Sequence, residues 1–235
     1  MATNSGIRRL LIANRGEIAA RIARAARDEG IAPLGIYSEA DRRAPYLHEM
    51  ERVAPVGPAP ATESYLNIER IIAAARSLEA DAVHPGYGFL SERAAFARSV
   101  AEAGLRFVGP PASAIAAVGD KREAKRHARA CNVTVVEGYD GEEQTLEALS
   151  REAQRIGFPL IIKATAGGGG RGMRVVARLR DFEEALASAK REALAGFGDD
   201  RVLLERYIAG ARHIEFQILA DAFGRIIHLG ERDCS

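Results

Sequence analysis

Hydrophobic residues in the first half of the chain alternate between short runs of strand length and longer stripes with helical spacing. The strand-like runs cover residues 9–13, 32–37, 82–84 and 105–108. The stripes between them predict helices, one ended by Gly30 and another running from Ile68 to Leu78 with Asn67 as its cap. Strands and helices that alternate at these lengths predict a parallel sheet with helices on both faces.

The second half of the chain has a different pattern, in which strands follow one another closely. We expect a linker helix over residues 120–131 and a second helix over 146–156. A capping box at Asp181 and Glu184 predicts a third helix, which ends near Phe197. Short strands are predicted at 160–164, 173–176, 202–205, 213–220 and 225–231. This pattern is typical of an antiparallel α+β domain.

The change of pattern falls close to residue 112, just after the turn signal Gly109-Pro110-Pro111. We therefore predict a first domain over residues 1–112 and a second over 113–235. Two domains agree with the length of 235 residues, since domains of about 100–150 residues are the most common. A chain of this length buries enough surface to fold without a disulfide or a structural metal.

Composition and charge narrow the classes of function. Hydrophobic residues make up 47% and charged residues 28%, and the net charge of +1 gives no overall attraction to nucleic acid or to an acidic membrane surface. The two cysteines, Cys131 and Cys234, lack the spacing of a zinc site. No apolar run is long enough to span a bilayer, and the first residues lack the apolar core of a signal peptide. We expect a cytoplasmic protein with neither a nucleic-acid nor a membrane partner.

The segment from Lys163 to Met173, KATAGGGGRGM, carries the strongest chemical signal. A flexible linker is the simplest interpretation, but linkers rarely lie between two strand-like segments with a cation at each side. Glycines let backbone N–H groups approach a ligand and form a nest for phosphate oxygens, which Lys163 could also reach. Such a charge pair is worth about 4 kcal/mol at ~4 Å and an effective dielectric constant of ~20, before desolvation.

Three better-known phosphate-binding loops fit this segment poorly. No Gly-Lys pair follows the glycines, as a P-loop requires, and the first strand is followed by NRGE (14–17) in place of the Rossmann glycine fingerprint. The glycine spacing is a weak match to the protein-kinase loop, and the other kinase motifs are missing. The segment therefore predicts a phosphate site of another type.

Other candidate residues have ordinary structural explanations when each is taken alone. Lys121 could be a solvated helix residue, and Glu205 to Ile208 could be the end of a core strand. His213 lies opposite the apolar face of its strand, where an isolated histidine is usually structural or solvated. The glycine-rich segment 84–90 could be only a tight turn.

Short phrases spread along nearly the whole chain form a collinear set. They are IANRGEIA (12–19), SYLN (64–67), HPGYGFLSE (84–92), FVGP (107–110), GDK (119–121), the segment from IK to GMRVV (162–176), RHIE (212–215) and ERDCS (231–235). Each phrase would be weak alone. Together and in this order they resemble the biotin carboxylase family, which includes the biotin carboxylase subunit of acetyl-CoA carboxylase and the corresponding parts of propionyl-, methylcrotonyl- and pyruvate carboxylases.

The resemblance implies a Rossmann-like parallel-sheet domain followed by the first part of an ATP-grasp domain, whose small α+β lid covers about residues 133–204. It implies that Lys121 and Lys163 bind ATP phosphates and that the glycine loop lies over them through Gly169 and Gly170. Ala166 departs from members that have a fifth glycine, and one methyl group is tolerated there if φ is negative.

By the same resemblance, the adenine of ATP would be held by a hinge that follows the predicted strand 202–205. The hinge residues are Glu205, Arg206, Tyr207 and Ile208, which act largely through the backbone of Arg206 and Ile208. His213 would lie near the nucleotide.

The resemblance also implies the reaction. ATP phosphorylates bicarbonate to carboxyphosphate, whose breakdown delivers CO₂ to biotin on a biotin carboxyl carrier protein or domain, the partner of a carboxyltransferase. In this family the Mg²⁺ ligands and the groups that bind and activate bicarbonate lie beyond Ser235. We therefore expect a truncated fragment without catalytic or metal-binding residues, inactive alone, from a protein that forms a homodimer at full length.

Two alternatives stay open at this point. One is another ATP-grasp ligase, such as a carbamoyl-phosphate synthetase or a purine carboxylase, which shares the phosphate chemistry but lacks the phrase at 84–92. The other is a nucleotide-binding or dimerising module without turnover.

Overall fold

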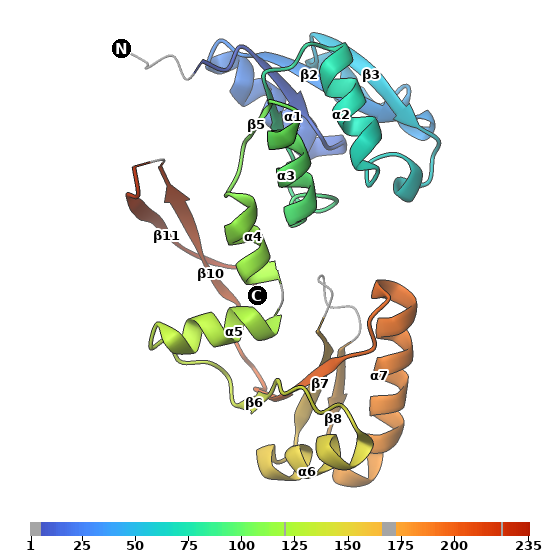
Figure 1. The fold of residues 1–235 in the computed structure, drawn as a ribbon, viewed down its shortest axis with the longest axis vertical. Coiled ribbons are helices and arrows are strands. Elements are labelled where there is room, and N and C mark those ends of the chain that lie inside the picture. Colours follow the sequence, from blue (N-terminus) through green and yellow to red (C-terminus); the bar gives the residue numbers. More distant parts are fainter. Residues whose placement is uncertain (1–5, 120, 166–172, 222) are drawn as a thin grey trace. The chain divides into compact units, whose positions relative to one another are not determined.

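The computed structural model describes residues 6–119, 121–165, 173–221 and 223–235. The chain forms two compact units, Met1–Gly119 and Asp120–Ser235 (Figure 1). The sequence-based boundary at residue 112 lies at the start of helix α4 (Ala112–Gly119), and in the structure this helix belongs to the first unit. Within the described residues, no helix is both long and apolar enough to cross a membrane.

The first unit is built around a five-stranded parallel sheet with the strand order β3-β2-β1-β4-β5. The strands are β1 (Arg9–Ile12), β2 (Ala32–Ser38), β3 (Arg52–Gly57), β4 (Ala82–His84) and β5 (Arg106–Phe107). Its other helices are α1 (Gly16–Asp28), α2 (Ile68–Ser77) and α3 (Ala94–Glu102). The strand order reverses between β1 and β4, and the carboxyl edge at such a point is where open α/β sheets usually bind ligands.

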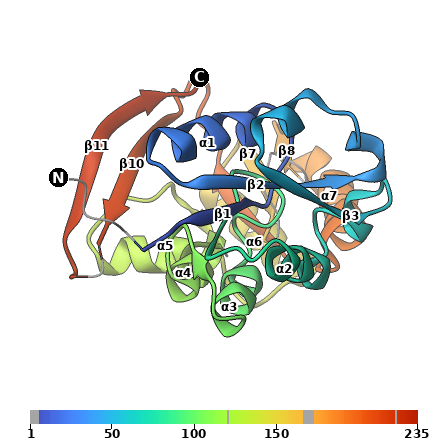
Figure 2. The same ribbon diagram turned by 90° about the horizontal axis from the view of Figure 1, so that it is seen from above.

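Helices cover both faces of this sheet, as the sequence predicts. Successive side chains of a strand point to opposite faces. Leu10 and Ile12 of β1 therefore pack with buried residues of α1, whereas Leu11 packs with residues of α2 and α3. Figure 2 shows α1 on one side of the sheet and α2 and α3 on the other. The central strands are buried on both faces for this reason, which explains their continuous apolar sequence.

The sequence pattern missed one strand of this unit and predicted one helix start well. Strand β3, with the sequence RVAPVG, has a proline in its middle. Proline cannot donate a ladder hydrogen bond, but β3 lies at the edge of the sheet, where it has one partner strand. The cap of α2 is confirmed, since the side chain of Asn67 accepts a hydrogen bond of 3.0 Å from the backbone N–H of Arg70.

The second unit contains two antiparallel sheets, in agreement with its predicted α+β character. The four-stranded sheet has the order β6-β9-β7-β8, and a hairpin pairs β10 with β11. The strands are β6 (Gly138–Tyr139), β7 (Leu160–Ala164), β8 (Met173–Val176), β9 (Val202–Arg206), β10 (Ile214–Ala220) and β11 (Ile226–Asp233). The helices are α5 (Lys121–Ala130), α6 (Leu146–Ile156) and α7 (Phe182–Phe197).

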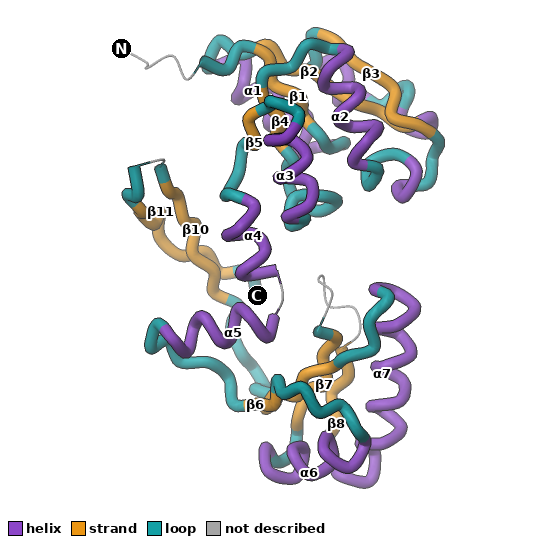
Figure 3. Tube along the Cα trace, viewed as in Figure 1, coloured by secondary structure: helices purple, strands orange, loops and turns teal. Residues whose placement is uncertain are grey.

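Helices α6 and α7 pack on one face of the four-stranded sheet and form the core of this unit (Figure 3). Along β7, Leu160 and Ile162 are fully buried in that core. Because side chains alternate along a strand, Ile161 and Lys163 point to the other face. The core thus fixes β7 in place, while the side chain of Lys163 faces away from the helices.

The capping box predicted at Asp181 is wrong. The backbone of Asp181 is already helical, and its side chain makes no capping hydrogen bond. A short 3-10 turn, Leu179–Asp181, leads directly into α7. The helix therefore begins from a preformed turn, and an N-terminal cap is not what starts it.

Candidate functional site

Lys163 lies near the end of β7, on the face of the sheet opposite the core. In the antiparallel ladder Lys163 pairs with Leu203, and Ile161 pairs with Glu205. Lys163 and Glu205 are therefore diagonal neighbours on the same face, at a separation that long side chains can bridge. The Lys163 ammonium group donates a hydrogen bond to Oε2 of Glu205.

Glu205 is shared between two lysines. Its other oxygen, Oε1, accepts a hydrogen bond of 2.9 Å from Nζ of Lys125, a residue of α5. Lys125 also donates to the backbone carbonyl of Val136 at 3.0 Å. The side chains of Lys125 and Glu205 are 11% and 12% exposed, and that of Lys163 is 25% exposed. We refer to Lys125, Glu205 and Lys163 as the Lys-Glu-Lys cluster.

Lys121 reaches the same end of β7 from the first turn of α5. Its Nζ donates a hydrogen bond of 3.2 Å to the backbone carbonyl of Ala164, the residue after Lys163. Lys121 and Lys125 are four residues apart, so they lie on one face of α5. The structure thus brings together the two lysines predicted to bind phosphate. The structure also adds Lys125, which was not predicted from the sequence. Its spacing of four residues from Lys121 places both on one helix face and could have indicated it.

The two lysines set the charge of the Glu205 carboxyl group. Burial alone would raise its pKa, but the hydrogen bonds from Lys163 and Lys125 outweigh burial and hold the pKa below its ordinary value. Glu205 is therefore ionised at neutral pH. An anionic ligand that binds Lys163 has to compete with this carboxylate.

Thr165, directly after β7, has a fully buried side chain whose hydroxyl has no hydrogen-bond partner among the described residues. Its backbone N–H donates to the carbonyl of Arg201 at 2.9 Å, so the residue itself is held in place. A buried hydroxyl without a partner costs about 1–3 kcal/mol. The next residues, 166–172, contain the glycines of the glycine-rich segment. They lie outside the described residues and include Gly169 and Gly170.

The residues predicted as an adenine hinge lie at the end of β9 and just after it. The backbone N–H of Arg206 donates to the carbonyl of Glu137 at 2.9 Å, and that of Tyr207 donates to the carbonyl of Pro159 at 3.1 Å. The side chains of Tyr207 and Ile208 are exposed. Glu205 belongs both to the predicted hinge and to the Lys-Glu-Lys cluster, so the predicted hinge is adjacent to Lys163, which is predicted to bind phosphate.

His213 lies just before β10. Its backbone N–H donates to Oγ of Ser235 at 2.8 Å, and its carbonyl accepts from the N–H of Cys234 at 2.8 Å. These hydrogen bonds close the end of the β10–β11 hairpin. The placement of His213 beside a nucleotide stays a prediction.

The described residues do not gather three or more His, Cys, Asp or Glu side chains into a group that could hold a metal ion. A nucleotide-bound Mg²⁺ needs only one or two carboxylates beside phosphate oxygens and water, so such a group is not required for the Mg²⁺ that the resemblance implies. The expectation that its ligands lie beyond Ser235 stays a prediction.

At the carboxyl edge of the parallel sheet in the first unit, a tight turn lies over the end of β1. The Asn14 side chain donates to the carbonyls of Pro85 and Tyr87 at 2.7 and 2.8 Å, which holds the 84–90 turn over the end of β1. Gly86 has a φ of +66°, and a Cβ atom there would lie 2.7 Å from Nδ2 of Asn14. This glycine is therefore required by the turn, in agreement with the simpler interpretation of the segment.

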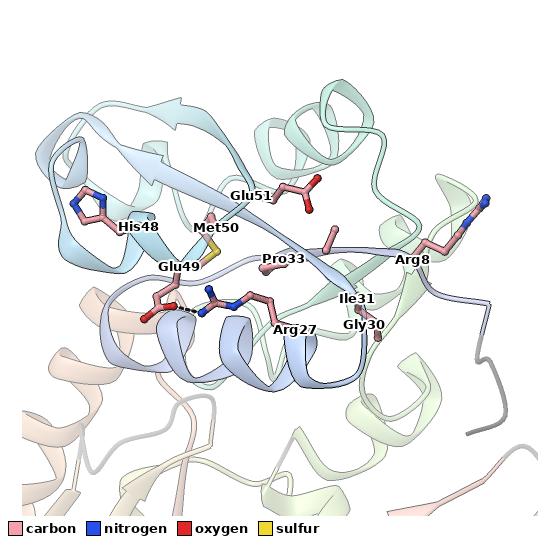
Figure 4. A pocket seen from close by; sticks show the side chains of 10 residues that line it. Arg8, Arg27, Gly30, Ile31, Pro33, His48, Glu49, Met50 and Glu51 are labelled. Carbon is pink, nitrogen blue, oxygen red and sulfur yellow. Dashed lines mark hydrogen bonds and ion pairs between the residues drawn. The ribbon is translucent and has the colours of Figure 1, made fainter. Parts of the chain in front are cut away.

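A surface hollow of about 410 Å³ lies at the opposite edge of this sheet (Figure 4). Arg8, Ala32 and Glu51 line it, at the amino ends of β1, β2 and β3. Arg27 and Glu49 form an ion pair beside it. Ligands of such sheets bind at the carboxyl edge, so this hollow is not where the fold predicts a site.

The two halves of the chain each match a known domain. Residues 6–115 match the biotin carboxylase N-terminal domain, and residues 120–235 match the ATP-binding domain of the carbamoyl-phosphate synthase L chain. The mitochondrial methylcrotonoyl-CoA carboxylase subunit alpha of Oryza sativa is 51% identical over 229 residues, which are 97% of this chain and 31% of that protein. The chain belongs to the biotin carboxylase family.

Solved structures of biotin carboxylases have the same fold. The Campylobacter jejuni biotin carboxylase, solved as a β-γ-ATP complex, superposes with a TM-score of 0.93 at 48% identity and covers 97% of this chain. The biotin carboxylase domain dimer of Hydrogenobacter thermophilus 2-oxoglutarate carboxylase, in complex with MgADP, ADP and bicarbonate, superposes with a TM-score of 0.93 at 42% identity. This chain spans 51% and 50% of those two structures.

Proposed function

We propose that this chain supplies ATP-binding residues to a biotin carboxylase. The complete reaction would use ATP and bicarbonate to carboxylate biotin on a carrier protein or domain, the first half-reaction of a biotin-dependent carboxylase. The observation that carries the proposal is the gathering of Lys121, Lys163 and Glu205 at the end of β7, just before the glycine-rich segment. The β-γ-ATP complex of the Campylobacter jejuni protein, which has the same fold, supports it.

In this proposal, the lysines at the end of β7 hold the phosphate groups of ATP. Two ammonium groups neutralise phosphate oxygens, while the N–H groups of Gly169 and Gly170 close over them. The segment from Glu205 to Ile208 holds the adenine, and His213 lies beside the nucleotide. Held in this way, the terminal phosphate is transferred to bicarbonate. Carboxyphosphate and ADP form. Carboxyphosphate then breaks down to phosphate and CO₂, and the CO₂ replaces the proton on the ureido nitrogen of biotin, which the phosphate takes up.

The proposal implies partners for the complete protein. They are bicarbonate, a biotin carboxyl carrier protein or domain, a carboxyltransferase and a second copy of the subunit. The carboxylase names of the relatives and the dimer of the Hydrogenobacter thermophilus domain support this set. The similar proteins include mitochondrial and chloroplastic forms, and a cytoplasmic location for this chain stays a prediction.

Bicarbonate-dependent ATP hydrolysis, measured with and without free biotin, tests the proposed function. The assay uses the complete subunit that would contain this chain, and ATP binding is measured on the 235-residue chain itself. We expect hydrolysis that requires bicarbonate and rises with biotin in the complete subunit, and ATP binding without turnover in the chain.

The alternatives give different results in the same assays. A complete subunit whose hydrolysis is stimulated by ammonia and not by biotin would be another ATP-grasp ligase. A chain that does not bind ATP would contradict the proposal, and turnover by the chain alone would contradict the predicted inactivity of the fragment. For substitutions of the lysines near Glu205, Lys190→Met is the matched control. Lys190 is a lysine of the same unit that bonds to the carbonyl of Gln144 and not to Glu205.

A further inference from the structure

The lysines of this chain are concentrated at one place. Lysine occurs at positions 121, 125, 163 and 190, and every other residue in the Lys+Arg total of 33 is an arginine. Three of these lysines, Lys121, Lys125 and Lys163, contact β7 or Glu205. An ammonium group is a compact charge that exchanges partners readily, whereas the planar guanidinium group favours fixed, two-pronged pairing. The choice of lysine here suits a site in which a cation has to change partner.

Lys163 is the lysine of the Lys-Glu-Lys cluster that is more accessible to solvent. Its side chain is 25% exposed, about twice the exposure of Lys125 at 11%. Lys125 is also anchored by a second hydrogen bond, to the carbonyl of Val136. A ligand that approaches from solvent therefore meets Lys163, while Lys125 stays behind it on Glu205.

Movement of Lys163 toward a phosphate group removes one of the two cations that pair with the Glu205 carboxylate. The Glu205 side chain is 12% exposed, and a buried carboxylate without a partner is strongly unfavourable. Lys125 keeps the carboxylate paired, because it bonds to the other oxygen of the same group. The charge of Glu205 is thus still compensated after Lys163 has left.

We propose that Lys125 is a positioning residue for phosphate binding, which holds the Glu205 carboxylate so that Lys163 can transfer from Glu205 to the phosphates of the nucleotide. This inference rests on the proposed function, since it takes Lys163 as a phosphate ligand. Without Lys125, Lys163 would be the sole charged partner of a buried carboxylate. The phosphates would then have to compete with an undivided ion pair.

Direct measurement of ATP and adenosine binding to the 235-residue chain tests this inference. Lys125→Met is expected to weaken ATP binding about tenfold, the size of a typical coupling between contacting charged groups. Binding of adenosine, which has no phosphates, is expected to be unchanged. Lys125→Arg keeps the charge and is expected to bind ATP nearly as well as the parent, and Lys190→Met serves as the matched control.

A second variant separates positioning from simple loss of packing. Glu205→Gln, added to Lys125→Met, removes the carboxylate that would hold Lys163 too strongly. We expect the double variant to recover most of the ATP affinity that Lys125→Met loses. If Lys125→Met does not fold, Lys125→Gln takes its place, because it keeps a donor for the Val136 carbonyl.

A measurement that does not involve ATP tests the same contact. The pKa of Glu205, followed by NMR of a labelled carboxyl carbon, is expected to rise in Lys125→Met and to stay in place in Lys190→Met. A parent chain that binds no ATP would contradict the proposed function. Retention of full ATP affinity by Lys125→Met, while Lys163→Met loses it, would overturn the inference and leave the proposed function standing. An unchanged pKa of Glu205 or failure of the double variant to recover would also overturn it.

Discussion

The carboxyl edge of the parallel sheet and the Lys-Glu-Lys cluster both gather charged groups, but they pair them differently. At the sheet edge, Arg15 forms an ion pair of 3.0 Å with Asp41 and also lies over the ring of Tyr65, 5.8 Å from its centre. The hydroxyl of Tyr65 donates to the same carboxylate oxygen at 2.7 Å. In the cluster, two ammonium groups share the one carboxylate of Glu205.

This difference distinguishes a structural network from the proposed ligand site. The guanidinium group of Arg15 uses its flat geometry on both a carboxylate and an aromatic ring, so that its position is fixed from two sides. Burial raises the pKa of the Tyr65 hydroxyl, which stays protonated and donates to Asp41. Each member of this network thus has a partner within the network. In the cluster, one carboxylate pairs with two ammonium groups, so an anionic ligand can take the place of the carboxylate at one of these ammonium groups.

The largest expected effect is on ATP binding by Lys163→Met. Loss of a charged hydrogen bond to phosphate is worth about 1.5–3 kcal/mol, which corresponds to about 10–100-fold weaker binding. The stability of the second unit should change much less, because Lys163 points away from its core. Equilibrium dialysis with labelled ATP measures the first quantity, and hydrogen exchange in β7 and β9 measures the second. Equal ATP affinity in parent and variant would remove the distinction between the two regions.

Asp41→Asn tests the other side of the comparison and is expected to destabilise the first unit by about 2 kcal/mol, since charged hydrogen bonds are worth ~1.5–3 kcal/mol. The change removes the charge that Arg15 and Tyr65 both contact. Hydrogen exchange in β1 and β2 measures the loss. Asp28→Asn, at an exposed position of α1, is the control. Reduced ATP binding with unchanged stability would show that this edge is a ligand site.

The sequence predicted these two regions unequally. The parallel sheet could be predicted because its apolar runs and helical stripes are local patterns. The phosphate-binding role expected for Lys121 and Lys163 rests on short collinear phrases and stays a prediction. Lys125 was not predicted, because its partner Glu205 is 80 residues away and is brought near by the pairing of β7 with β9. Edge strand β3 was missed because Pro55 interrupts its pattern. Local sequence therefore predicts elements and motifs, and it predicts long-range charge pairs poorly.

The pH dependence of stability sharpens the comparison further. The pKa of Glu205 is lowered in the folded chain, so its contribution to stability is complete above its unfolded pKa of about 4.3 and is lost as the pH falls through the folded value. Glu205→Gln should therefore lose less stability than the parent when the pH is lowered from 6 toward 3. Hydrogen exchange in β7 and β9 over this range measures the difference. Other acids of the unit, such as Asp199, also have a lowered pKa, so the difference between variant and parent is the informative quantity.

The smallest expected effect belongs to Thr165→Val, which tests the unsatisfied hydroxyl beside the cluster. Valine has nearly the same shape, and it removes a buried polar atom that has no partner in the part of the chain that the structure describes. Stability of the second unit should therefore stay the same or rise, by up to about 1 kcal/mol. Polar atoms left unsatisfied in a fold are often kept for function, at a cost in stability. If the hydroxyl serves the nucleotide, ATP binding should weaken while stability rises.

Thr165→Ser is the matched variant, because it keeps the hydroxyl and loses only the methyl group. It should bind ATP like the parent if the hydroxyl contacts the nucleotide. If both variants bind ATP equally well, the hydroxyl has no part in binding, and the chemistry at the end of β7 lies with the lysines and the glycine-rich segment. If Thr165→Val lowers stability, the hydroxyl has a partner in solution, and the argument from its burial is wrong. ATP binding and stability, measured together, therefore decide whether the proposed ligand site of the second unit extends past Lys163 to Thr165.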